Sequence, residues 1–142
     1  MSQDLEEGRR VLKIEAQSIL DIAERLNGGF QKAVDMIMAC KGKVIVTGIG
    51  KSGQIARKMA STLSSTGTPA LYLHPAESSH GDMGVVEKTD LVVAFSYGGE
   101  APEMGPLLSY LARKDVPLIA FTGKNESSLA RSATVVLDIA VK

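Results

Sequence analysis

The sequence of 142 residues predicts a three-layer α/β domain built on a doubly wound, five-stranded parallel sheet. Two observations predict this fold: short continuous apolar runs such as "KVIVTG" and "LVVAFS", and helical patterns between several of these runs. Apolar runs of this kind are typical of strands buried on both faces, as in a parallel sheet. We expect one domain over residues 1–142, with two helices in 1–42 and the α/β core in 43–142.

The first expected helix covers residues 5–26, where apolar residues fall on one face at helical spacing and charged residues lie between them. These apolar residues are Leu12, Ala16, Ile19, Ile22, Ala23 and Leu26. The segment "LNGG" at 26–29 predicts the end of this helix, with glycine as its C-cap. A second helix is expected over residues 29–40, ending at "CKGK".

The five expected strands are "KVIVTG", "ALYLH", "LVVAFS", "PLIAFTG" and "TVVLDIA". For a strand order of 2-1-3-4-5, ligands collect at the carboxyl ends of the strands, in the crevice between the first and third strands. The loops that would gather at this edge are 48–53, 74–82, 96–100 and 122–128. All four are rich in small, polar or charged residues, so we expect the functional site there.

The composition argues against several kinds of partner. The chain has 16 basic and 16 acidic residues and few aromatic ones, which disfavours nucleic acid and anionic membranes. No secretory signal and no apolar run long enough to cross a bilayer is present, so we expect a cytoplasmic protein. The single cysteine, Cys40, fits a reducing compartment; it is either a catalytic thiol or a small apolar residue that closes the second helix.

The loop after the first strand carries two phosphate-binding patterns. Gly48-x-Gly50-x-x-Gly53 is the dinucleotide fingerprint, and Gly50-Lys51-Ser52 looks like the end of a P-loop. A P-loop needs an earlier glycine where this chain has isoleucine. A dinucleotide site needs an acidic residue at the end of the second strand, where this chain has histidine. Neither nucleotide is therefore the favoured ligand.

A phosphate site without a nucleotide remains. The hydroxyls of Ser52 and Ser96 and the backbone N–H groups of 50–53 and 98–100 can converge on one anion at the expected edge of the sheet. The alternative is a tight strand-to-helix turn in which the glycines only permit positive φ.

With these residues identified, the chain closely resembles the sugar isomerase (SIS) domain of the arabinose-5-phosphate isomerases. The resemblance rests on "GKSG", "STGTPA" and "HPAESSHGD" and continues through "SYGGEAPE" to the end of the chain. It implies a flavodoxin-like SIS fold and an aldose–ketose isomerase. This family interconverts ribulose 5-phosphate and arabinose 5-phosphate through a cis-enediol, and the product supplies synthesis of Kdo for lipopolysaccharide or capsule.

The resemblance also implies a catalytic set. Lys51 matches the lysine after the family's glycine loop, which we assign to the phosphate or the developing oxyanion; the alternative is an exposed lysine at a helix start. Glu103 matches a catalytic carboxylate and is the expected base, although a glutamate in a first helical turn is also favoured by the helix dipole. His80 matches an active-site histidine and is a candidate for ring opening or for binding a sugar hydroxyl.

The substrate-binding residues expected from the resemblance and the loops are Gly50, Ser52, Gly67, Thr68, His74, His80, Ser96, Gly98, Gly99 and Glu100. His74 matches a family position that contacts substrate and takes a divalent ion such as zinc. A histidine that ends a strand is also commonly structural, and one ligand does not make a metal site. No cofactor is expected to be required.

The chain departs from the family pattern at two points. The family usually reads Ser-x-Ser-Gly-Glu where this chain has Ser96-Tyr97-Gly98-Gly99-Glu100, so Gly98 replaces a serine. Family members also continue past the position of Lys142 with an acidic residue, a closing helix, a histidine and, in longer members, a pair of CBS modules. We therefore expect a truncated SIS core, whose alternative function is to bind a phosphosugar without converting it. We also expect a homo-oligomer, a dimer or tetramer, that buries the helix at 5–26 and an uncovered face of the sheet.

Overall fold

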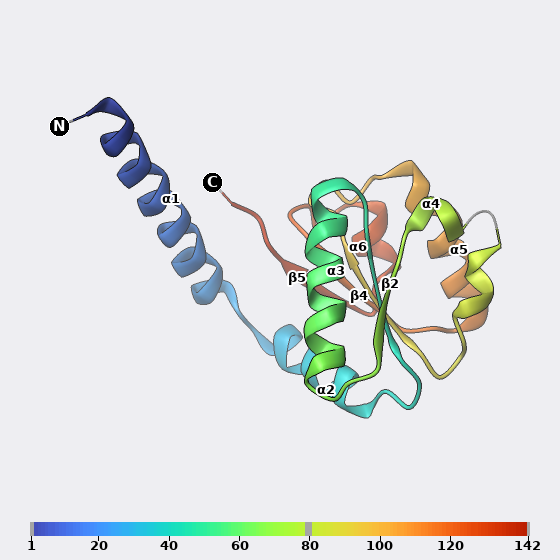
Figure 1. The fold of residues 1–142 in the computed structure, drawn as a ribbon. Coiled ribbons are helices and arrows are strands. Elements are labelled where there is room, and N and C mark those ends of the chain that lie inside the picture. Colours follow the sequence, from blue (N-terminus) through green and yellow to red (C-terminus); the bar gives the residue numbers. More distant parts are fainter. Residues whose placement is uncertain (1, 79–80, 142) are drawn as a thin grey trace.

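The computed structural model describes residues 2–78 and 81–141 of the chain. A five-stranded, fully parallel sheet of order β2-β1-β3-β4-β5 forms its centre (Figure 1). The strands are β1 (Val44–Gly48), β2 (Ala70–Leu73), β3 (Leu91–Phe95), β4 (Leu118–Thr122) and β5 (Val135–Asp138). The predicted fold class, strand order and parallel pairing are confirmed.

The helices follow the strands in the expected alternation. They are α1 (Gln3–Arg25), α2 (Gly28–Ala39), α3 (Gly50–Ser65), α4 (Pro75–Ser78), α5 (Gly105–Lys114) and α6 (Ser128–Ser132). Two short 3₁₀ segments are η1 (Asp82–Val85) and η2 (Pro102–Met104). The predicted ends of the first two helices differ from the observed ends by at most two residues.

The predicted reason for the end of the first helix is wrong. Leu26, not a glycine, is the C-cap of α1, and Gly28 is the first residue of α2. Between them Asn27 is the N-cap of α2, where its side-chain oxygen accepts a hydrogen bond from the amide of Gly29 at 2.8 Å. The segment "LNGG" therefore starts a helix through asparagine capping as much as it ends one.

Both faces of the sheet are buried, because alternate residues of each strand point to opposite sides. On one side Ile45 and Val92 pack with Leu107 of α5 and Leu129 of α6. On the other side Val44, Val46 and Val93 pack with residues of α2 and α3, among them Ala33, Ala56 and Ala60. The two layers of helices fix the carboxyl edge of the sheet, where the loops of interest emerge.

Helix α1 is not part of this core. Figure 1 shows it extending away from the sheet, and none of its residues is buried. Large apolar side chains along it are well exposed, namely Leu12 at 67%, Ile19 at 68% and Leu20 at 58%. No helix among the described residues is long and apolar enough to cross a membrane.

Candidate functional site

The glycine loop is shaped by close contacts between its own backbone atoms. A side chain at Gly48 would place its Cβ 2.8 Å from the carbonyl oxygen of Ser52, and one at Gly53 would lie 2.7 Å from the carbonyl oxygen of Gly48. Gly50 has φ of +59°, which favours glycine. The N-cap of α3, Ile49, offers no capping side chain, so no side chain satisfies the first amides of this helix, and amides of this kind can bind an anion.

The two side chains predicted to act from this loop lie at the start of α3. Lys51 is exposed, and Ser52 is half-buried. An exposed ammonium beside uncapped helix amides adds positive charge where a phosphate would bind. The loop at 96–100 follows β3, the strand next to β1, so the structure brings the two predicted phosphate loops to the same edge of the sheet.

The second loop is held by its own serine. The hydroxyl of Ser96 accepts a hydrogen bond from the amide of Gly99 at 3.1 Å. Gly99 has φ of +68°, and a Cβ there would lie 2.0 Å from the hydroxyl of Ser127, so a larger residue is excluded. Gly98 is exposed, and a Cβ on it would meet nothing within 4 Å. Gly98 stands where the resemblance implies a serine, and the missing side chain leaves open space in the loop.

Glu100 makes a structural contact that the sequence did not indicate. One carboxylate oxygen accepts from the amide of Ser128 and the other from the hydroxyl of Ser128, both at 2.7 Å. These hydrogen bonds lower the pKa of the Glu100 carboxyl below its ordinary value. The carboxylate thus joins the second loop to the start of α6.

His74 follows the last residue of β2. Its Nδ1 accepts a hydrogen bond from the amide of Ala76 at 3.2 Å, which leaves Nε2 to carry the proton of the neutral ring. Among the described residues no three His, Cys, Asp or Glu side chains gather closely enough to hold a metal ion. The divalent ion expected at His74 stays a prediction. The other predicted histidine, His80, lies outside the described residues.

Glu103 and the pair Gly67–Thr68 lie at different ends of the fold. Glu103 is exposed in η2, directly after the second loop and next to the buried Met104. Gly67 and Thr68 follow the C-terminal end of α3, a helix of 16 residues that begins at the glycine loop. A helix of that length spans about 24 Å, so within one chain the structure does not bring these two residues to the glycine loop.

One contributor to the site was missed by the sequence reasoning. The hydroxyl of Tyr72, on β2, donates to the carbonyl oxygen of Gly48 at 2.7 Å, and the guanidinium of Arg57 lies 4.0 Å from the centre of its ring. A tyrosine in an apolar run indicates only a strand, so the sequence carried no signal for this contact. Cys40, by contrast, is the C-cap of α2 and half-buried, as its apolar interpretation expects.

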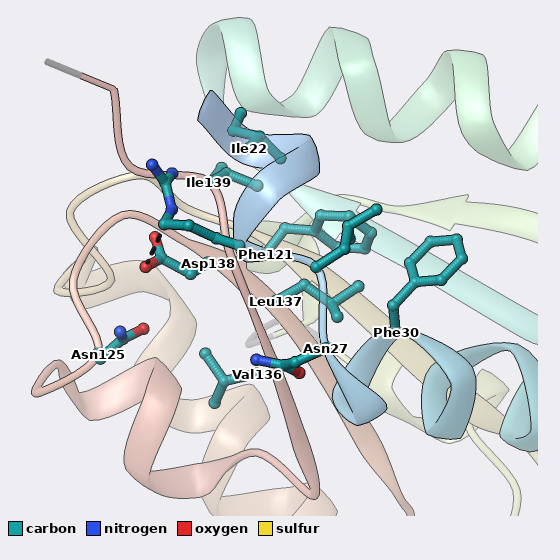
Figure 2. A pocket seen from close by; sticks show the side chains of 11 residues that line it. Ile22, Asn27, Phe30, Phe121, Asn125, Val136, Leu137, Asp138 and Ile139 are labelled. Carbon is teal, nitrogen blue, oxygen red and sulfur yellow. Dashed lines mark ion pairs between the residues drawn. The ribbon is translucent and has the colours of Figure 1, made fainter. Parts of the chain in front are cut away.

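One hollow among the described residues lies away from the glycine loop. A groove of about 700 Å³ lies between the junction of α1 and α2 and the outer strands β4 and β5 (Figure 2). Its apolar side chains are Ile22, Leu26, Phe30, Phe121, Val136, Leu137 and Ile139. At one end the guanidinium of Arg25 lies 3.8 Å from the carboxylate of Asp138. The groove is mainly apolar. Residues at the end of α1 line it, and no residue of the two predicted phosphate loops does.

Relatives of known sequence share most of this chain. The arabinose 5-phosphate isomerase GutQ of Salmonella typhi is 49% identical over 97% of this chain and 43% of its own length. The arabinose 5-phosphate isomerase KdsD of Shigella flexneri is 47% identical over 94% of this chain and 41% of its own length. The chain thus spans less than half the length of these relatives.

Solved structures share the fold. An Escherichia coli protein in complex with arabinose 5-phosphate superposes with a TM-score of 0.83 at 36% identity, covering 100% of this chain and 77% of that one. A candidate sugar-phosphate isomerase of Listeria monocytogenes gives a TM-score of 0.94 at 29% identity, covering 100% of this chain and 76% of that one. The family described as "SIS domain" matches residues 37–142. The chain therefore belongs to the SIS domain family.

Proposed function

We propose that the chain is the substrate-binding core of an arabinose-5-phosphate isomerase, which interconverts ribulose 5-phosphate and arabinose 5-phosphate. The observation that carries this proposal is the pair of small-residue loops, 48–53 and 96–100, at the carboxyl edge of neighbouring strands. The proposal is also supported by the relatives GutQ and KdsD, which are named arabinose 5-phosphate isomerases. The product would supply Kdo for lipopolysaccharide or capsule.

The phosphate of the pentose would lie at the start of α3. Uncapped amides, the hydroxyl of Ser52 and the ammonium of Lys51 are the groups that would hold it. Lys51 also has the charge to stabilise an enediolate, whose negative charge develops only during the reaction. Because Ser96 already accepts from Gly99, its hydroxyl proton remains available as a donor to the sugar or the phosphate.

The proton transfer requires a base near C1 and C2. In the direction from arabinose 5-phosphate, the base takes the proton from C2, the electron pair of that C–H bond forms the C1–C2 double bond, and the π pair of the C1 carbonyl moves to O1, which takes a proton to complete the enediol. The proton on O2 then leaves, its electron pair forms the C2 carbonyl, and the pair of the C1–C2 double bond takes a proton at C1. Glu103, exposed beside the second loop, is the proposed base. Such general acid–base help contributes about 10²–10⁴ in rate. His80 is the proposed residue for ring opening.

The exposed side of α1 supports a homo-oligomer. Leu5, Leu12, Ile19 and Leu26 recur at every seventh position, and all four are at least 47% exposed. A repeat of seven places these residues along one stripe, the pattern by which helices pair with each other. Gly67 and Thr68 of a second copy are the proposed source of these two substrate contacts, because α3 carries them away from the glycine loop of their own chain.

The test is direct conversion. The purified chain is incubated with ribulose 5-phosphate, and arabinose 5-phosphate is followed by NMR, with Lys51→Ala and Glu103→Gln in parallel. The proposal is supported if the parent chain forms arabinose 5-phosphate and both variants form much less of it. Binding of the pentose phosphate without conversion would leave a phosphosugar-binding core, and no binding would contradict the proposal.

A further inference from the structure

Tyr72 connects the two elements that flank the glycine loop. Its hydroxyl bonds to Gly48, the last residue of β1, at 2.7 Å. Its ring lies under the guanidinium of Arg57, which is on α3 after the loop, at 4.0 Å. The ring is half-buried, and burial raises the pKa of the Tyr72 hydroxyl, so this group keeps its proton for donation at neutral pH.

The third glycine of the loop is explained by the same contact. A Cβ at Gly53 would lie 2.9 Å from the hydroxyl oxygen of Tyr72 and 2.7 Å from the carbonyl oxygen of Gly48. Any larger residue would push these two atoms apart. The spacing that resembles a dinucleotide fingerprint therefore has a local cause, which is to let the tyrosine hydroxyl reach the carbonyl of Gly48.

This hydrogen bond fixes the direction of a carbonyl dipole. The Gly48 carbonyl oxygen accepts from the Tyr72 hydroxyl on β2, and it lies close to Gly53 in the first turn of α3. A carbonyl oxygen turned toward a phosphate would repel it, because both carry negative charge. Fixing the carbonyl before the ligand arrives also reduces the ordering cost of binding.

We propose that Tyr72 is a positioning residue for the glycine loop, which orients the loop for a phosphate through its bond to Gly48. This inference rests on the proposed function, in which that loop holds the phosphate of the substrate. Tyr72 also meets the ring of His74 edge-on, with 6.3 Å between ring centres, so the same side chain limits where that histidine can lie.

The test compares two tyrosine hydroxyls. Tyr72→Phe keeps the ring under Arg57 and removes only the hydroxyl. Tyr110→Phe is the matched control, because its hydroxyl also donates to a backbone carbonyl, that of Val86 at 3.5 Å, and its ring also faces a cation, that of Lys114 at 5.6 Å. Each protein is titrated with arabinose 5-phosphate and with inorganic phosphate, and the dissociation constants and backbone amide shifts are followed by NMR.

We expect Tyr72→Phe to weaken binding of both ligands about tenfold, the size that loss of one hydrogen bond produces. Its amide shifts should centre on residues 48–53, while Tyr110→Phe binds like the parent chain. Equal binding by Tyr72→Phe and the parent would overturn the inference about Tyr72 and leave the proposed function standing. Weakened sugar-phosphate binding with unchanged binding of inorganic phosphate would also overturn it, since the effect would not act through the phosphate. Absence of binding by the parent chain would overturn the proposed function as well.

A second variant tests the contact between the Tyr72 hydroxyl and the Gly48 carbonyl by a change in the loop itself. Gly53→Ala presses a methyl group against the Tyr72 hydroxyl and the Gly48 carbonyl. It should weaken phosphate binding in the same direction and move the same amide signals. A folded Gly53→Ala protein with unchanged affinity would contradict the inference independently of Tyr72→Phe.

Discussion

Glu100 and Ser128, 28 residues apart in sequence, are joined by two hydrogen bonds of 2.7 Å, one to each oxygen of the carboxylate. Their bonds connect the loop after β3 to the first turn of α6. The amide of Leu129 donates to the carbonyl of Gly99 at 3.1 Å and reinforces the connection. The position and rigidity of the second proposed phosphate loop therefore depend on α6, an element that contributes no residue to the predicted site.

Glu100→Gln should loosen this loop, because an amide cannot accept with both of its terminal atoms. We expect weaker binding of arabinose 5-phosphate with little change in the rest of the fold. Ser128→Ala removes only the hydroxyl bond and should give a smaller effect in the same direction. In the double variant the two losses should not add, since both act on one connection. Additive losses, measured by calorimetry, would show that the two residues act separately.

The Glu100 pair also predicts a dependence on pH. Because hydrogen bonds lower the pKa of Glu100 in the folded chain, its contribution is present above the ordinary glutamate pKa and is lost as pH falls through the lower folded value. The difference in thermal midpoint between the parent and Glu100→Gln should therefore shrink in acid. A difference that stays constant from neutral pH to strong acid would contradict this account.

Gly98→Ser introduces the hydroxyl that the resemblance implies at this position. A Cβ at this position meets nothing within 4 Å, and Gly98 is not among the glycines with positive φ. The variant should fold with unchanged stability. If the new hydroxyl reaches the phosphate, affinity for arabinose 5-phosphate should rise by roughly ten- to hundredfold, the range for one bond to a charged group. Unchanged affinity would show that this hydroxyl does not face the ligand.

Gly53→Ala should also lower the stability of the fold. Its Cβ would lie below 3 Å from two atoms, so the backbone must shift, at a cost of about 1–3 kcal/mol. Gly105→Ala, at the start of α5, is the control, because a Cβ there meets nothing within 4 Å and glycine has no special φ at that position. Urea unfolding of the two variants measures the difference; equal midpoints would contradict the tight packing at Gly53.

Asp90 provides a second test of pH dependence, at the opposite edge of the sheet. Its side chain is fully buried and pairs with the ammonium of Lys43 at 2.8 Å. Burial raises the pKa of this carboxyl, but the bonds from Lys43 and from the amide of Glu87 outweigh that effect and hold the pKa below its ordinary value. Its stabilisation is therefore present above the unfolded pKa of about 4 and is lost as pH falls through the folded value.

Asp90→Asn should lower the free energy of unfolding by about 1–3 kcal/mol at pH 7, because a buried network loses its charged acceptor. The deficit relative to the parent should narrow as the pH of the unfolding experiment approaches 3. Lys43→Met, which leaves the backbone bonds to Asp90 in place, should cost less. A larger loss in Lys43→Met than in Asp90→Asn would contradict this assignment of the stabilising bonds.

The exposed stripe on α1 predicts self-association. Replacement of Leu12 and Ile19 by serine removes two of its most exposed apolar side chains, at 67% and 68%, from a helix with no buried residue. The parent should be a dimer or larger by light scattering, and the double variant should dissociate with its sheet intact. A monomeric parent chain at high micromolar concentration would contradict the predicted oligomer.

Much of the fold could be predicted because its signals are local. Five apolar runs separated by helical patterns specify a parallel sheet, and glycines at 48, 50 and 53 specify a tight turn into α3. The placement of the two phosphate loops at neighbouring strand ends followed from strand order alone. The family could also be identified from motifs within single loops.

Other features depend on residues that are distant in sequence. Glu100 resembles a ligand-binding residue in its motif, yet Ser128 takes both of its oxygens. Gly67 and Thr68 lie in a family motif, yet α3 carries them away from the glycine loop. Nothing in the strand "ALYL" indicates that Tyr72 reaches Gly48.

The sequence by itself therefore determined the layers, the strand order and the edge of the sheet at which the proposed phosphate loops emerge, because hydrophobic periodicity and glycine turns act over a few residues. The tertiary structure alone decided which polar side chains are free to meet a ligand and which are held by neighbours. Packing brings hydrogen-bond partners together, such as Glu100 with Ser128 and Tyr72 with Gly48. No local sequence pattern encodes such partners.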